Sequence, residues 1–509
     1  MRKLQRREFL KLAGTGAGAY VASGFFADRL LAGVAPAPGL GLFEERFGVD
    51  AATLREVLQA ALSKGGDFAD LFLEYTTSNG VEMEDDIIKE SDEDIRLGIG
   101  IRVLKGPQTG YGYTSELQLD AMRRAALTAA AIASSATAGA VAPFAERPPG
   151  RQVYQLRTPF SEGTLADRIA LVKEAYAAAA AHDKRIVKVR SELSDQLQVV
   201  TILNSEGLLT TDVRPQARMR VTAIAESEGN RVTGSDNAGG RVGRAFYATA
   251  GTTPKEIGTR AAEEAIILLS AVYPVPGDQP VVLGNKNSGV VIHEAVGHPF
   301  EADGVWKKTS IMWDRMGQKV ASPLVTIYDD ATIAEARGSL NIDDEGTATG
   351  KAMLVERGVL TGFLHDRLSA RMLGATPNGH GRRQSFRNPP LPRMNNTFLA
   401  QGSTPPEEII ASVKKGFYAK SYEGGMVQGT GKFTFSVNLG YLIEDGKLTA
   451  PVKTATLIGI NLQMLNDIEM VGNDLGTFLG SCGKGGQSAP VTAGSPTFKV
   501  RAMTVGGRA

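Results

Sequence analysis

The chain has 509 residues but a single cysteine, Cys482, so no disulfide can form within it. Basic and acidic side chains nearly balance, 56 against 55, so we expect no nucleic-acid partner and no attraction to an acidic membrane. Aromatic residues are scarce at 6%, whereas 59 glycines favour tight turns. Beyond the N-terminal region, no segment has the run of about 20 apolar residues that a membrane span needs. With 42% hydrophobic residues, the composition predicts a globular protein with a sizeable core.

The first 37 residues have the features of an export signal. Residues 6–11 read RREFLK, which resembles the twin-arginine motif, and a weakly apolar stretch rich in alanine and glycine follows at 12–26. That stretch is shorter than the roughly 20 residues of a membrane span. The alternative is an ordinary amphipathic N-terminal helix. We expect residues 1–37 to direct export by the twin-arginine route, which carries folded proteins, with no stable membrane insertion afterwards.

Residues 38–271 are predicted to form an α+β domain. Asp50 is placed to cap a helix whose apolar residues form one stripe, and longer helices are predicted at about 117–134, 164–182 and 254–269. Ser78-Asn79-Gly80 predicts a hairpin between strands at 70–77 and 81–87. The stretch at about 137–151, rich in alanine, proline and glycine, is predicted to be a linker.

A second domain is predicted at residues 280–509, after a proline-containing boundary at 272–279. Short strand-like runs there alternate with glycine-containing turns, among them 357–358 and 444–446. We predict a strand-rich and possibly barrel-like half that also carries a metal-binding helix. The fold class expected for the whole chain is therefore α+β.

The metal-binding helix is predicted from two of the five histidines in the chain. His293 and His298 are ligands of the kind that zinc prefers, and Glu294 follows the first of them. Residues five apart on a regular α-helix differ by roughly 140° in direction, so the two rings would point apart. They can meet on one metal only if the helix widens by one residue, as a π-bulge does, or ends near Gly297. The alternative is two ordinary buried histidines, but a glutamate in such an apolar run is costly to bury without a partner.

A metal needs a third ligand, and the residues alone leave several candidates open. These are Glu301, Asp303, His365, His380 and Cys482. Cys482 lies in the glycine-rich stretch 480–486, where small residues let the backbone approach a metal. As a thiolate it would complete a His-His-Cys set with an open fourth position, and ligation would shield the single thiol. The alternative is that Cys482 is a small buried hydrophobic residue, which is common for free cysteines.

These motifs, taken in order, resemble the TldD/PmbA metalloproteases, and specifically their metal-bearing TldD-like branch. The similarity extends from about Asp67 onward, and its densest segments are 293–298 with Glu301, 381–385, 392–394, 431–433, 451–459 and 482–488. The resemblance implies a zinc ion held by His293, His298 and Cys482, with Glu294 as the catalytic residue. It also implies a dimer that encloses a narrow cavity for small or unfolded peptides, in some members with a metal-free paralogue as the partner. The export signal is a departure, because familiar members are cytoplasmic.

We therefore expect a zinc-dependent peptidase in which zinc activates water and Glu294 transfers the proton to the leaving amine. Glu301 is a candidate for orienting a histidine ring. Arg393, with neighbouring arginines, is a candidate for gripping a peptide, although such arginines more often tie a loop to its own carbonyls. The alternatives are a non-catalytic binding or assembly subunit stabilised by zinc, and a metal hydrolase that acts on non-peptide amides or esters.

Overall fold

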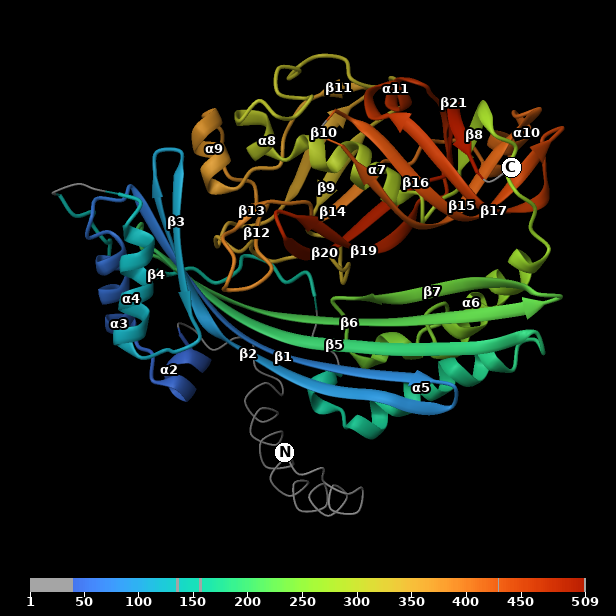
Figure 1. The fold of residues 1–509 in the computed structure, drawn as a ribbon. Helices are drawn as coiled ribbons and strands as arrows, with labels where there is room; N and C mark the ends of the chain where they lie inside the picture. Colours follow the sequence, from blue (N-terminus) through green and yellow to red (C-terminus); the bar gives the residue numbers. More distant parts are fainter. Residues whose placement is uncertain (1–39, 134–136, 155–157, 429, 508–509) are drawn as a thin grey trace, which may run out of the picture.

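The computed structural model describes residues 40–133, 137–154, 158–428 and 430–507, so the predicted export signal at 1–37 lies outside the described residues. The fold is mixed α+β, as predicted, and strands dominate it (Figure 1). A large N-terminal sheet has helices on one side, and the strand-rich C-terminal half lies on its other side (Figure 1). In the described part of the chain, no helix is both long enough and apolar enough to pass through a lipid bilayer.

The N-terminal sheet has seven strands in the order β3-β2-β1-β5-β6-β4, with β7 also paired to β6. Their bounds are Phe68–Glu84 (β1), Ile87–Lys105 (β2), Gln108–Thr114 (β3), Ala145–Glu146 (β4), Ile186–Asn204 (β5), Leu208–Ser227 (β6) and Asn230–Gly240 (β7). The helices of this half are Leu42–Phe47 (α2), Ala51–Ala61 (α3), Leu119–Ala130 (α4), Leu165–Ala180 (α5) and Pro254–Leu269 (α6). Helices α5 and α6 pack their apolar residues against one face of the long strands.

Local sequence signals account for these helices. Asp50 accepts a hydrogen bond from the backbone N–H of Thr53 and caps α3, whose apolar stripe is buried as predicted. Helices α5 and α6 begin with capping boxes at Thr164 and Thr253, and α6 has the predicted bounds. Helix α4 is shorter than predicted, because it ends at Ala130.

The hairpin predicted at residues 78–80 is wrong. Strand β1 continues through this stretch, where Gly80 pairs with Asp92 of β2 and the other edge pairs with β5. The turn lies instead at Asp85 and Asp86, both of which have positive φ values, 51° and 61°. Aspartate tolerates this conformation, which a two-residue hairpin turn requires. Pairing along both edges of β1 therefore outweighs the local preference of the Asn-Gly pair.

The C-terminal half contains a closed barrel of five strands, which confirms the predicted barrel-like character. The strand order is β17-β16-β15-β8-β21, and pairing between β17 and β21 closes the ring. The bounds are Gly277–Leu283 (β8), Lys415–Val427 (β15), Lys432–Glu444 (β16), Lys447–Ile460 (β17) and Phe498–Gly506 (β21), with β18 (Ile468–Val471) beside β21.

A six-stranded sheet lies next to the barrel, in the order β11-β10-β9-β14-β20-β19. Its strands are Ile327–Asp330 (β9), Lys351–Glu356 (β10), Val359–Leu360 (β11), Asn396–Leu399 (β14), Gly476–Lys484 (β19) and Gln487–Ser495 (β20). A short pair, Gly381–Arg382 (β12) and Leu391–Pro392 (β13), stands apart from it. The helices of this half are Gly289–Ile292 (α7), Ala302–Trp306 (α8), Arg367–Leu373 (α9), Pro406–Ala411 (α10) and Asn461–Asn466 (α11).

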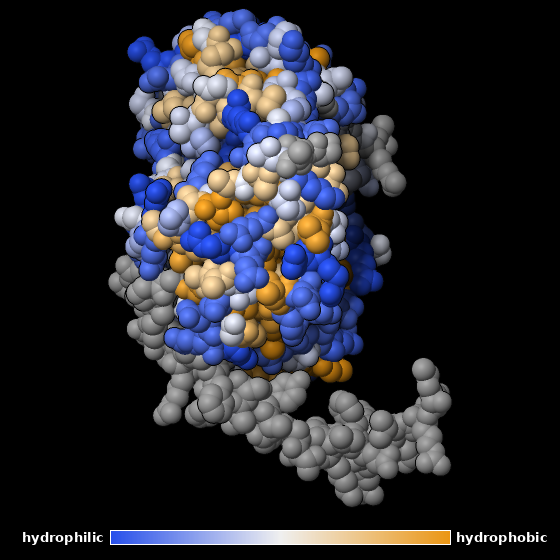
Figure 2. Space-filling view, turned by 90° about the vertical axis from the view of Figure 1, so that its left-hand side faces the viewer, coloured by the Kyte–Doolittle hydropathy of each residue, from blue (hydrophilic) through white to orange (hydrophobic). Residues whose placement is uncertain are grey.

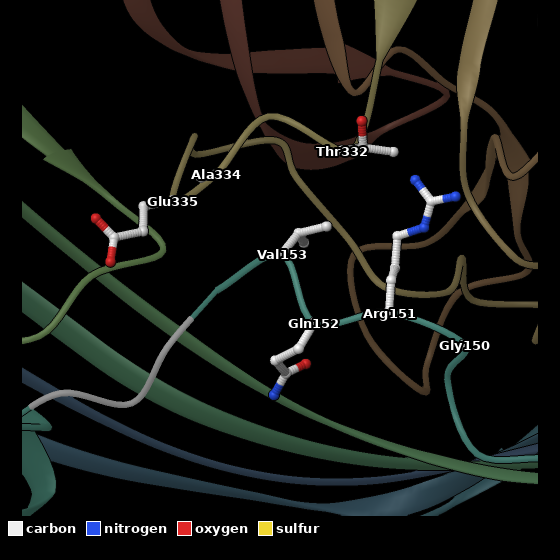
Figure 3. A pocket seen from close by; sticks show the side chains of 7 residues that line it. All are labelled: Gly150, Arg151, Gln152, Val153, Thr332, Ala334 and Glu335. Atoms are coloured by element: carbon white, nitrogen blue, oxygen red, sulfur yellow. The ribbon is translucent and has the colours of Figure 1, made fainter.

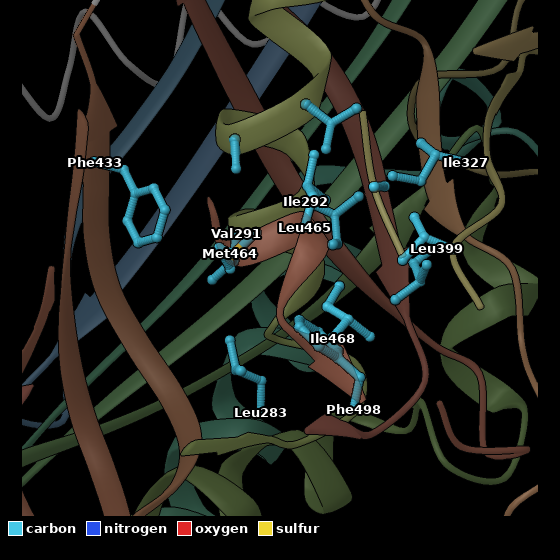
Figure 4. Close-up of a cluster of buried hydrophobic side chains, with 14 of the residues drawn as sticks. Leu283, Val291, Ile292, Ile327, Leu399, Phe433, Met464, Leu465, Ile468 and Phe498 are labelled. Carbon is cyan, nitrogen blue, oxygen red and sulfur yellow. The ribbon is translucent and has the colours of Figure 1, made fainter. Parts of the chain in front are cut away.

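The largest apolar core joins the barrel to this sheet and holds α7 (Figure 4). Val291 and Ile292 of α7 are fully buried in it together with Phe433 of the barrel and Leu399 of β14. The segment that carries the predicted histidines therefore starts from a fixed helix.

The end of the molecule formed by α4, β3 and α9 exposes several apolar side chains among charged ones (Figures 1 and 2). Tyr113, Leu127, Met372 and Leu373 are each more than one-third exposed. Figure 2 shows that hydrophilic residues separate the apolar surface of this face into patches.

Buried ion pairs connect the N-terminal sheet to the C-terminal half. Arg102 of β2 binds Asp70 of β1 through Nε at 2.7 Å and Glu345 of the C-terminal half through Nη1 at 2.6 Å. All three side chains are at most 1% exposed. Tyr111 adds a hydrogen bond from its hydroxyl to the carbonyl oxygen of Phe386, at 2.7 Å.

Replacing Arg102 with Met should lower the free energy of unfolding by about 3–5 kcal/mol, because the buried Glu345 would lose its cation and Asp70 would keep only Arg383, at 3.4 Å. Urea denaturation followed by circular dichroism measures this change. Arg501→Met is the control, since Arg501 is 65% exposed and its ion pair is solvated, so no measurable change is expected. Equal stability of the two variants would contradict the assigned role of Arg102.

Candidate metal centre

The helix that carries the two histidines changes its winding between them. Helix α7 continues as a π-helical turn over His293–Gly297 and then as a 3-10 turn over His298–Phe300. The wider π turn brings residues five apart onto one side, and the ring centroids of His293 and His298 lie 5.3 Å apart. The predicted widening of the helix is confirmed.

Neighbouring residues hold this irregular turn in place. A Cβ at Gly297 would overlap Sδ of the buried Met394, so only glycine fits there. Pro299 has no backbone N–H and cannot continue the helical hydrogen bonds. The carbonyl oxygen of Ala295 accepts a hydrogen bond from Nδ2 of Asn461, at 3.0 Å.

The turn places both histidines against Cys482 of β19. Ligand atoms of His293, His298 and Cys482 all lie within 4.8 Å of one another, and Cys482 Sγ is 3.5 Å from His298 Nε2. His293 is 4% exposed, and within the described part of the chain neither of its ring nitrogens has a hydrogen-bond partner. Buried polar atoms without partners are costly and call for a ligand. Two imidazoles and a thiol fit a zinc-like ion.

The charges in the cluster are coupled. Burial alone would raise the pKa of the Cys482 thiol, but His293 and His298 lower it to about 5. Burial alone would lower the pKa of His298, but Glu301 and Cys482 raise it to about 11. These opposite shifts follow from the close approach of the thiol, the two rings and Glu301.

Glu301 orients the ring of His298. Its Oε2 lies 3.0 Å from His298 Nδ1 and 3.1 Å from Nζ of Lys484. Burial would raise the pKa of Glu301, but Lys484 and His298 lower it to about 2, so it stays anionic. A carboxylate at Nδ1 leaves Nε2 free to face the thiol, as in the carboxylate–histidine pairs of metal sites.

Glu294 lines a cavity at the edge of the cluster. Its side chain is 19% exposed, and its Oε2 is 3.9 Å from His298 Nε2. Burial raises the pKa of Glu294 above its ordinary value. The cavity has a volume of about 630 Å³ and is also lined by His298, Asp303, Lys484 and residues 425–428 at the end of β15. A carboxyl group of raised pKa beside a metal cluster is suited to accept a proton.

Two of the other candidate ligands lie elsewhere. His380 is fully buried and contacts Asp329 Oδ1 at 3.1 Å and Asn378. His365 is buried apart from the cluster, where desolvation lowers its pKa to about 4. Asp303 lines the cavity but pairs with Lys484, its Oδ1 being 2.6 Å from Nζ.

Arg393 does not line the cavity. Its side chain is fully buried, and it donates hydrogen bonds to the carbonyl oxygens of Cys482 and Gln487. Arg382 donates in the same way to Met394 and Pro490. Both arginines thus support the strands behind the cluster, which is the loop-tying role that the sequence left open.

The sequence did not single out Lys484 or the end of β15. Lys484 could have been found from its spacing, because residues two apart on a strand share a face and Cys482 is two positions earlier. The sequence signal for residues 425–428 was weaker. It consisted of two adjacent glycines, Gly424 and Gly425, before the turn.

A second cavity, also of about 630 Å³, shares no lining residue with the first (Figure 3). Its lining residues are Gly150, Arg151, Gln152, Val153, Thr332, Ala334 and Glu335. None of these described residues is a histidine or cysteine, so we place the candidate site at the first cavity.

The thiol of Cys482 offers a direct test of this electrostatic arrangement. In the metal-free protein, thiolate absorbance in the ultraviolet should appear as the pH rises through about 5, rather than near 9, since both imidazoles stabilise the anion. The chain has no other cysteine, so Cys482→Ser supplies the baseline. Onset near pH 9 would show that the histidines do not face the sulfur.

Comparisons with known proteins agree over most of the chain. Models of the PmbA/TldA metallopeptidase family match as domain 1 at residues 69–133, as the central domain at 159–269 and as the C-terminal domain at 276–507. The Metalloprotease TldD homolog of Haemophilus influenzae is 38% identical over 466 residues, which cover 89% of this chain and 96% of that protein.

Two solved structures share the fold. A proposed modulator of a DNA gyrase from Thermotoga maritima aligns with a TM-score of 0.74 at 24% identity, over 89% of this chain and 99% of that one. TldE from Thermococcus kodakarensis aligns with a TM-score of 0.70 at 18% identity, over 89% of this chain and 100% of that one. The family models and the relative of 38% identity show that the chain belongs to the PmbA/TldA metallopeptidase family.

Proposed function

We propose that this protein is a zinc-dependent peptidase that cleaves small or unfolded peptides, with Glu294 as the general base. The observation that carries the proposal is the buried, unpartnered ring of His293 beside His298 and Cys482, at the edge of a cavity lined by Glu294. Membership of a metallopeptidase family supports the same chemistry.

His293, His298 and Cys482 would hold the zinc at the edge of the cavity that Glu294 lines. Zinc bound there would supply a Lewis acid that polarises a peptide carbonyl and makes water acidic near neutral pH. Glu294 would take the proton from that water and pass it to the leaving amine nitrogen. Its raised pKa favours the first step, because a stronger base takes the proton more readily.

The size of the cavity supports a small or extended substrate. A volume of about 630 Å³ is within the range of small-ligand pockets and has room for a short stretch of peptide, but not for a folded domain.

We also propose that the protein works as a dimer, formed by two copies or with a metal-free paralogue. The fold is shared with a protein named TldE, whereas the relative of 38% identity carries the name TldD, and two differently named proteins of one fold support a paired arrangement. Light scattering would measure the molar mass in solution, and a strict monomer that is fully active would contradict this proposal.

Export by the twin-arginine route completes the proposal and is supported by Arg6 and Arg7 in residues 1–37. Replacing both with lysine should keep the protein in the cytoplasm, because the pathway recognises the paired guanidinium groups. Fractionation of cells and immunoblotting measure this, with Arg2→Lys as the control. Unchanged export of the double variant would contradict the assignment.

The Glu294→Gln variant tests the catalytic role. Gln keeps the size of the side chain but cannot accept the proton, so turnover of an unfolded peptide should fall about 10²- to 10⁴-fold while zinc stays bound. Glu264→Gln is the matched control, because burial also raises the pKa of Glu264 but this residue binds Ser421 and Asn438 away from the site.

Undiminished turnover of Glu294→Gln would contradict the role of Glu294 as the general base. Zinc binding without cleavage of any peptide by the wild-type protein would point instead to an assembly subunit, or to a hydrolase of non-peptide amides, which a substrate panel would separate.

A further inference from the structure

Strand β19 carries two side chains of the site on one face. Lys484 follows Cys482 by two positions, and residues two apart on a strand point the same way. The Lys484 Nζ lies 2.6 Å from Asp303 Oδ1, 2.9 Å from the carbonyl oxygen of Pro392 and 3.1 Å from Glu301 Oε2. An ammonium group has three N–H donors, so these contacts use all of them. Lys484 therefore has no donor left for a substrate carboxylate, although it lines the cavity.

The contact with Glu301 continues to a histidine of the cluster. Oε2 of Glu301 faces both Lys484 and His298 Nδ1, the latter at 3.0 Å, while Oε1 has no hydrogen-bond partner within the described residues. The Glu301 side chain is 3% exposed. A carboxylate buried to this extent costs several kcal/mol unless a cation and hydrogen bonds compensate it. Apart from His298, Lys484 is the only cationic side chain of the described chain within 4.0 Å of this carboxylate.

We propose that Lys484 is a positioning residue of the metal centre, acting through Glu301 on the ring of His298. The inference rests on the proposed zinc site and adds a residue to it. Lys484 holds Glu301 in place through the 3.1 Å contact with Oε2, so that Glu301 can accept a hydrogen bond from Nδ1 of His298 and leave Nε2 facing the sulfur of Cys482. It acts on zinc affinity and ring orientation and makes no contact with substrate.

The same lysine also ties together parts of the chain that are distant in sequence. His298 and Cys482 are 184 positions apart and come from different elements. Lys484 is rigidly linked to Cys482 along β19, and its bonds to Glu301 and Asp303 fix the segment that follows His298. One ammonium group thus links the strand of Cys482 to the segment that follows His298.

The first test is zinc binding by Lys484→Met. The full-length protein, stripped of metal, is titrated with zinc against a competing chromophoric chelator, and the absorption spectrum of the cobalt-substituted form reports the ligand geometry. We expect zinc affinity to fall about 10- to 100-fold, the usual effect of losing support for a metal ligand, with an altered cobalt spectrum.

The matched control is Lys499→Met. Lys499 is 15% exposed, against 19% for Lys484, and it also forms an ion pair, with Glu469 at 3.2 Å, but on the barrel strand β21. Its variant should bind zinc like the wild type. Wild-type affinity and spectrum in Lys484→Met would overturn the proposal.

A double-mutant cycle with Glu301→Gln tests whether Lys484 acts through Glu301. Once Glu301 is neutral, removing the lysine should cost little more zinc affinity, because its target charge is gone. An undiminished loss in the double variant would overturn the proposal, since Lys484 would then act by another route.

Two further variants decide the matter if Lys484→Met fails to fold. Lys484→Arg keeps a cation near Glu301 and should lose less zinc affinity than Glu301→Gln. Asp303→Asn keeps the contact between Lys484 and Glu301 and should stay within a few-fold of the wild type. Losses in both as large as in Glu301→Gln would overturn the assigned role. These readouts do not depend on peptide cleavage, so a failure of the peptidase leaves them intact, whereas a wild-type protein that binds no zinc overturns both proposals.

Discussion

The site depends on one departure from regular helical geometry. His293 and His298 are five residues apart, and only the π turn between them lets both rings face the sulfur of Cys482. Such a turn is held in place by its surroundings. The apolar core fixes α7 at its start, Met394 leaves room only for Gly297, and the next residue but one is a proline. Core packing is thus the reason that two imidazoles converge.

The topology of the C-terminal half places the thiol of Cys482 beside the two histidines. Strand β19 is the edge of a six-stranded sheet, and it pairs with β20 on one side only. Arg393 and Arg382 add buried hydrogen bonds to the carbonyls of these strands, so the position of Cys482 does not rest on the edge pairing alone. The geometry of the metal cluster is therefore determined by two supports, the core beneath α7 and the arginines behind β19.

Much of this arrangement follows from local sequence. The cap at Asp50 and its apolar stripe predicted α3, and the spacing of His293 and His298 predicted a helix that widens or ends near Gly297. What local sequence could not supply was long-range pairing. Gly80 looked like part of a turn but is held in a strand from both edges, and the third candidate ligand stayed open because the topology that brings Cys482 across 184 positions has no local signal. Lys484 could have been predicted, since residues two apart on a strand share a face and Cys482 lies two positions earlier.

The charges around the cluster also bear on the strength of the proposed catalysis. A thiolate ligand would leave a bound zinc ion less positive than three neutral imidazoles, which weakens it as a Lewis acid. Glu294 offsets this, because burial raises its pKa and makes it a stronger base than an exposed carboxylate. Lys484 and His298 lower the pKa of Glu301, which stays ionised. Two glutamates seven positions apart thus differ in the pKa of their carboxyl groups: burial dominates at Glu294, whereas Lys484 and His298 dominate at Glu301, which holds the ring of His298.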